Sequence, residues 1–278
     1  MNLTHENNLI REINNLSASG KIQNSVGLTA QDAKSGIEKL VQIIRQRFNA
    51  VQFYFSAIQN LDINFYFGIQ AISSTELKLE WSSASKSFIN FTDSDFDVQI
   101  SLLNSGMLVE NSALIIFIVL QSFFSNLISL EDCIAKIINI AYDLIPSEDR
   151  PSYIRRALDN RMSTSALTLH LRTFHAIGQD GKPDKTGSTF NIAKTIRNQL
   201  MHDDIDGVMV SSSPISLSGF PTASKLHFRD SFFPPNTDSA NTEMVTFCQN
   251  AYDETVNFVN ECYRLIYADL QQSGVLPI

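Results

Sequence analysis

The chain has 278 residues, of which 44% are hydrophobic and 18% are charged, and this composition is typical of a globular protein that buries a core. Its formal net charge of −8 argues against a protein that binds nucleic acid over its whole surface. The 3 cysteines are far apart and form no C-x-x-C pair, which argues against a zinc site and a disulfide framework. Residues 1–6 have neither the basic start nor the apolar run of a signal peptide, so we expect a cytoplasmic protein with reduced thiols.

Helical periodicity dominates the start of the chain. Residues 2–17 fit a short polar helix, and Thr29–Leu61 predicts a longer one whose apolar residues recur at helical spacing. Thr29 is a suitable N-cap for this second helix. Between Ile63 and Ile100 the period changes, and Leu77–Trp81 and Phe88–Phe91 resemble short strands of a hairpin or of an irregular cover.

An uncharged segment, Asn111–Leu130, raises the question of a membrane. A spanning helix needs about 20 mostly apolar residues. In this segment the apolar run Ala113–Leu120 is followed by polar residues, and no cluster of Lys or Arg flanks it. We therefore expect a buried central helix and no membrane contact.

The second half of the chain also predicts helices. They cover Asn111–Ile128 and Leu130–Ile145 (separate or continuous), Ser152 to about Ile177, Thr189–His202, and Asn241–Gln272. Before the last of them lies a loop-rich segment, Asp203–Asp238, which includes a hairpin near Val208–Val210 and Lys225–Phe228. The pattern predicts an all-α fold, a multi-helix up-and-down bundle. It carries a small N-terminal β-hairpin or irregular insertion and a loop-rich insertion before the last helix. We divide it into residues 1–105, a helix-plus-hairpin region that is separate or integral, and the bundle of residues 106–278.

Positive charge is concentrated in one part of this acidic chain. Ser147–His202 contains 9 Lys and Arg against 5 Asp and Glu, a net charge of +4, so the remainder carries −12. A basic face of this kind is compatible with binding a short piece of RNA. An ordinary solvated helix face explains the charge equally well.

The end of the Thr189–His202 helix combines a permanently cationic, planar side chain with one that exchanges protons near neutral pH, Arg197 and His202. Metal-free cleavage of a phosphodiester requires such a pair. At about 100° per residue, Lys194, Arg197, Asn198 and His202 fall within an arc of about 140° on the helix. The apolar residues lie on the opposite side, and they are Ile192, Ala193, Ile196 and Leu200.

The pattern R-N-x-x-x-H, formed by Arg197, Asn198 and His202, resembles the catalytic motif of the HEPN superfamily. That superfamily includes many prokaryotic ribonucleases of toxin–antitoxin and defence systems. The run Ser125–Tyr142 also resembles the long early helix of HEPN bundles, and the likeness extends over roughly residues 110–272.

This resemblance implies an endoribonuclease that needs neither a metal nor another cofactor. The RNA 2′-hydroxyl attacks its own 3′-phosphate and leaves a 2′,3′-cyclic phosphate and a 5′-hydroxyl. His202 acts as general base or acid, Arg197 stabilises the phosphate charge and Asn198 orients either group, while Lys194 on the same face binds substrate. The resemblance also implies a homodimer with a composite active site and an antitoxin protein as a further partner.

Three other interpretations use the same residues. In the first, Arg197 and His202 cap the C-terminus of their helix, where positive charge is favoured, and have no catalytic role. A HEPN-like bundle can also bind or assemble without cutting, since a fold does not determine an activity. Finally, His202 and Asp203 form an HD dyad of the kind found in metal-dependent phosphohydrolases, with His170 or His175 as an upstream ligand and Asp253 as a downstream one.

Overall fold

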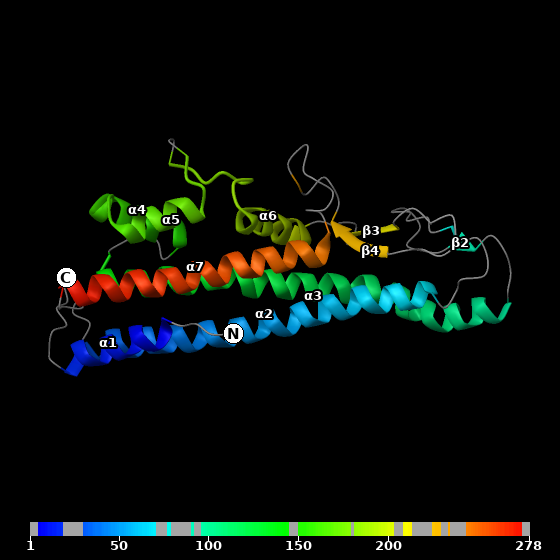
Figure 1. The fold of residues 1–278 in the computed structure, drawn as a ribbon, viewed down its shortest axis with the longest axis horizontal. Coiled ribbons are helices and arrows are strands. Elements are labelled where there is room, and N and C mark those ends of the chain that lie inside the picture. Colours follow the sequence, from blue (N-terminus) through cyan, green and yellow to red (C-terminus); the bar gives the residue numbers. More distant parts are fainter. Residues whose placement is uncertain are drawn as a thin grey trace. The chain divides into compact units, whose positions relative to one another are not determined.

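The computed structural model describes residues 5–18, 30–70, 77–78, 90–91, 96–144, 150–178, 181–202, 208–212, 224–228, 233 and 243–273. Within these ranges the chain forms seven α-helices and two short hairpins (Figure 1). The helices are α1 (Glu6–Ala18), α2 (Ala30–Gln70), α3 (Phe96–Tyr142), α4 (Pro151–Met162), α5 (Ala166–Phe174), α6 (Thr189–His202) and α7 (Met244–Ser273). The expected all-α, multi-helix fold is therefore confirmed.

The chain folds into two compact units that interleave along the sequence. The first unit comprises residues 1–51, 125–191 and 251–278, and the second comprises residues 52–124 and 192–250. Helices α2, α3, α6 and α7 each supply residues to both units.

The core of the first unit is built from helical stripes of aliphatic side chains. On α1 the stripe is Leu9 and Ile13, and on α2 it is Ile37, Val41 and Ile44, all of them buried. Spacings of three and four residues place each set on one face of its helix. At the edge of this core, the buried Glu6 carboxylate of α1 pairs with the Arg45 guanidinium of α2, and the Tyr142 hydroxyl of α3 donates to Asp269 of α7 at 2.5 Å.

Helix α3 joins the two helical patterns expected from Asn111 to Ile145 into one continuous helix. Within the described residues, one stretch of it, Phe117–Tyr142, has the length and apolar composition of a membrane span, and half of that stretch is buried. It also carries Glu131, whose carboxylate is buried in an ion pair. A charge paired inside the protein favours a position in the core for this part of α3.

The sequence predicts a single helix from Ser152 to about Ile177. This prediction is wrong, because the structure has two helices in that range, α4 and α5. The break falls at Ser165, whose backbone is extended and whose hydroxyl oxygen accepts the Thr168 N–H at 3.1 Å. This is the geometry of a helix N-cap. A serine in a polar Ser-Thr-Ser turn therefore starts a second helix.

The second unit contains a hairpin of β3 (Val208–Ser212) and β4 (Ser224–Phe228), in which Val208 lies opposite Phe228. The hairpin expected here is confirmed. The other strand pair, β1 (Leu77–Lys78) with β2 (Asn90–Phe91), falls where the short strands were expected. Phe228 of β4 joins an aromatic cluster with Phe124 of α3 and Phe247 of α7, at centroid distances of 6.1 and 5.5 Å.

The three cysteines Cys133, Cys248 and Cys262 are unpaired and buried, as expected. Burial raises the pKa of each thiol above its usual value. The protonated thiols therefore behave as small apolar core groups.

Candidate functional site

The structure forms the motif helix α6 with the predicted bounds, Thr189–His202. Its first turn is held by side chains that accept backbone N–H groups. Glu254 Oε2 accepts from Phe190 N at 3.1 Å, and Ser188 Oγ accepts from Asn191 N at 3.1 Å. These bonds satisfy donors that a helix start leaves without partners, so the beginning of α6 is firmly placed.

The faces of α6 agree with the sequence pattern where side chains are described. The buried side is formed by Phe190, Ala193, Ile196 and Leu200, and Ile192 is half-buried. Asn198 is exposed, whereas Lys194 and Arg197 are half-buried. The His202 backbone completes the helix, but its side chain lies outside the described residues, as does Asp203. The structure thus places Arg197 and Asn198 but not the imidazole that would complete the motif.

The Arg197 guanidinium retains an unused donor. Its Nε atom is buried and has no hydrogen-bond partner among the described residues. A buried donor left without an acceptor costs about 1–3 kcal/mol. An anionic oxygen supplied by a ligand would remove this cost, and the planar guanidinium matches a phosphate well.

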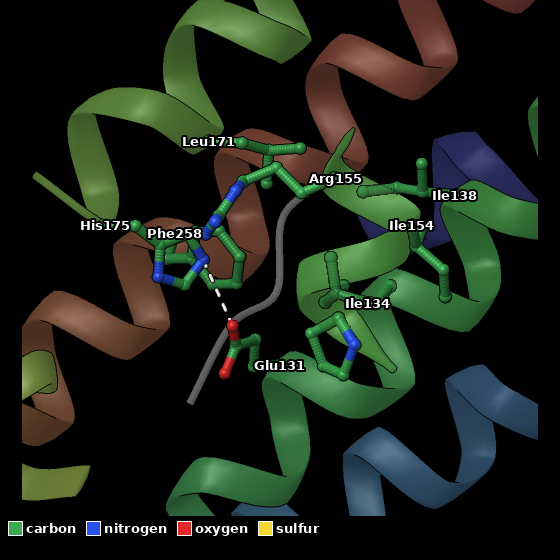
Figure 2. Close-up of a pocket in the computed structure, with 10 residues that line it drawn as sticks. Glu131, Ile134, Ile138, Ile154, Arg155, Leu171, His175 and Phe258 are labelled. Atoms are coloured by element: carbon green, nitrogen blue, oxygen red, sulfur yellow. Dashed lines mark ion pairs between the residues drawn. The ribbon is translucent and has the colours of Figure 1, made fainter. Parts of the chain in front are cut away.

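A second polar cluster lies inside the first unit, around the pair of Glu131 from α3 and His175 from the end of α5 (Figure 2). The His175 Nε2 atom is 3.2 Å from Glu131 Oε1, and the two side chains are only 4% and 7% exposed. Arg155 of α4 lines the same pocket. Burial lowers the pKa of Arg155, and the charge of Glu131 acts in the opposite direction.

The walls around this pair are apolar and leave little space. They are formed by Ile134, Ala135, Ile138, Pro151, Ile154, Leu171 and Phe258. The room inside corresponds to about one water molecule. The cluster therefore has a structural role, which is to hold the helices together, because a substrate does not fit into this space.

Asn191 links this cluster to the start of α6. Its side-chain amide donates to the His175 carbonyl at 3.0 Å and to the Asp184 carbonyl at 2.7 Å. The first turn of the motif helix is thereby bound to the residue that pairs with Glu131.

Sequence reasoning overlooked Glu131, Arg155, Asn191 and Glu254. A signal existed for Glu131, which follows Leu127 by four residues and precedes Ile134 and Ile138 on the apolar face of α3. A charged residue at such a position predicts a buried partner. For the partner itself there was no signal, since a single His offers no distinguishing pattern.

The alternative based on an HD dyad depends on His202 and Asp203, which lie outside the described side chains. Its proposed upstream ligands have other contacts, since His175 pairs with Glu131 and His170 stacks on Phe258 at 5.7 Å. In the part of the chain that the structure describes, no group of three His, Cys, Asp or Glu could hold a metal.

Comparison with known proteins gives no independent guide to the site. The chain matches no protein-family model, no curated protein and no solved structure. The resemblance to HEPN proteins therefore rests on Arg197, Asn198 and His202 and on the helical bundle that carries them.

Proposed function

We propose that this protein is a metal-independent endoribonuclease of HEPN type. The observation that carries the proposal is the division of α6 into two faces. Its apolar side chains are buried, while Asn198 is exposed and the Arg197 Nε–H has no acceptor among the described residues. A guanidinium and an amide are thus kept on one side of a helix anchored at its start.

The reaction follows from these groups and from the histidine one turn further along. A base removes the proton of the RNA 2′-hydroxyl, whose oxygen attacks the adjacent phosphorus. The bond from phosphorus to the 5′-oxygen breaks, and an acid protonates that oxygen. Arg197 stabilises the negative charge that builds on the phosphate, and Asn198 orients the phosphate or the imidazole.

The two proton transfers need two groups, and His202 of one chain supplies one of them. A second motif helix, from another copy of the chain, supplies the other. We therefore propose a homodimer with a composite active site. Lys194, half-buried on α6, adds positive charge for the RNA backbone.

A ribonuclease of this kind suits a cytoplasmic toxin–antitoxin or anti-phage defence role. Cleavage of cellular RNA is harmful unless it is restrained. A protein antitoxin is therefore the second partner that we propose beside RNA.

The decisive experiment incubates the purified protein with mixed RNA, with and without EDTA, and maps the cleaved ends. We expect 2′,3′-cyclic phosphate and 5′-hydroxyl ends in both conditions, and no cleavage by His202→Ala. His227→Ala and Arg11→Ala are matched controls, because they remove the same side-chain types from elements other than α6.

Each alternative gives a different outcome in the same experiment. RNA that is bound but left intact by the wild-type protein indicates a non-catalytic binding module. Cleavage that EDTA abolishes indicates the HD-type phosphohydrolase. Cyclic-phosphate ends that persist in His202→Ala contradict the proposed site.

A further inference from the structure

The first unit contains an open groove that is separate from the Glu131–His175 cluster, and we call it the α5–α7 groove. Helix α7 supplies Glu254, Asn257, Phe258, Asn260 and Glu261, while α5 supplies His170, Thr173 and Phe174, and His5 completes the lining. The groove has a volume of about 530 Å³. This is the size of a small-molecule site.

Two buried acceptor atoms of this groove have no partner among the described residues. The His170 ring is bonded to the Phe258 backbone, yet its Nε2 atom is buried without a partner. The ring nitrogen that donates is therefore Nδ1, and Nε2 keeps a lone pair. Burial lowers the pKa of His170, so this lone pair is present at neutral pH. The second acceptor is Asn260 Oδ1.

The remaining lining adds carboxylates and an aromatic wall. Glu261 accepts hydrogen bonds from Arg264 at 2.5 and 2.8 Å, which lower the pKa of its carboxyl and keep it ionised. Phe174 and Phe258 stack with ring centroids 3.8 Å apart. No Lys or Arg is among the described residues that line the groove. Hydrogen-bond acceptors and negative charge thus line one open space beside this buried aromatic pair.

We infer that the α5–α7 groove binds a small organic cation with ammonium or guanidinium groups, such as a polyamine. Such a ligand supplies the donors that His170 Nε2 and Asn260 Oδ1 lack, and its charge is attracted by the ionised Glu261. Since no described lining residue is a Lys or an Arg, the groove has no cationic side chain of its own for a phosphate, which favours a cation over the RNA backbone. The inference is independent of the proposed ribonuclease activity.

Isothermal titration calorimetry with spermidine tests this inference. The titration is done at about physiological ionic strength, where surface charges are screened within ~8 Å. We expect one saturable site. Glu261→Gln removes the ionised anchor and His170→Phe removes the lone pair while keeping the ring stacked on Phe258. Each should weaken binding at least about tenfold, since each removes a hydrogen bond to a charged group.

The matched control is Asp253→Asn, which removes the same charge from an exposed position of α7 outside the groove. It should leave the affinity within about twofold, as surface charges contribute little. Triacetylated spermidine, which is neutral, should not bind, whereas arginine amide should. The inference is overturned if neither cation shows a saturable site. It is equally overturned if the acetylated compound binds as well as spermidine, or if Asp253→Asn and Glu261→Gln weaken binding alike. Thermal melts of each variant confirm that it is folded before titration.

Discussion

The Glu131 carboxylate lies 3.2 Å from the His175 imidazole in the interior of the first unit, with both side chains almost completely buried. Glu131 is in the middle of α3, and His175 directly follows α5. Through the His175 carbonyl, which accepts from Asn191, this contact also reaches the first turn of α6. One polar contact therefore ties together three helices, including the one that carries the proposed active site.

We predict that Glu131→Ala strongly destabilises the protein. Removing one member of a buried, paired set leaves the other without compensation, at a cost of about 3–5 kcal/mol. Urea denaturation followed by circular dichroism measures the change in the free energy of unfolding. Asp132→Ala is the control, because it removes an exposed carboxylate from the next position of α3 and should change stability by only about 0.5 kcal/mol. Similar losses in the two variants would contradict the structural role of the pair.

A second prediction concerns Asn191, whose amide bridges the His175 and Asp184 carbonyls. Asn191→Ala removes both bonds and should lower the free energy of unfolding by about 2–3 kcal/mol. Asn160→Ala, at an exposed position of α4, should leave it unchanged or slightly raised, because Ala favours helices. Thermal melts of the two variants make the comparison. The idea fails if Asn191→Ala melts with the wild-type protein.

The sequence was a good guide wherever a regular period continues for many residues. A helical repeat of apolar residues predicts both the bounds of α6 and its buried positions, Ala193, Ile196 and Leu200. The break at Ser165 was missed because apolar spacing continues across it, and only the cap geometry reveals the new helix. The contact of Glu131 with His175 joins residues 44 positions apart, a pairing that the folded chain alone determines.

Lowering the pH should destabilise the protein through His170. Burial lowers its pKa in the folded chain below the 6.5 of an exposed imidazole. Below pH 6.5 the unfolded chain therefore binds a proton that the folded chain does not. Stability is lost as the pH falls from that value through the folded pKa, by up to about 1.4 kcal/mol per pH unit.

This effect is isolated by comparison with His170→Phe, which cannot titrate. Urea denaturation at about pH 7.5 and about pH 5.5 should show a larger loss for the wild-type protein than for the variant, since imidazoles change charge in this interval. Carboxyl groups titrate in both proteins and so cancel in the difference. Equal losses would show that His170 does not contribute.

Substitutions of Arg197 should separate charge from shape in the proposed ribonuclease. Arg197→Ala removes a donor aimed at the transition state and should lower kcat by about 10²–10³. Arg197→Lys keeps the charge but lacks the planar guanidinium, so its rate should lie between the rates of the wild-type protein and of Arg197→Ala. Cleavage of a short labelled RNA gives the rates, and a 2′-deoxy analogue should remain intact because it lacks the nucleophile. Cleavage of that analogue would rule out attack by the 2′-hydroxyl.

The composite site predicts that activity depends on protein concentration. If each chain supplies one His202, a monomer lacks either the general base or the general acid, and general acid–base catalysis contributes about 10²–10⁴ to a rate. The cleavage rate per chain should therefore fall on dilution through the dissociation constant of the dimer, which light scattering measures separately. The two curves should share a midpoint, because loss of the partner and loss of the second imidazole are the same event. A rate per chain that stays constant while the dimer dissociates would place the whole site in one chain and require a second proton donor outside the motif.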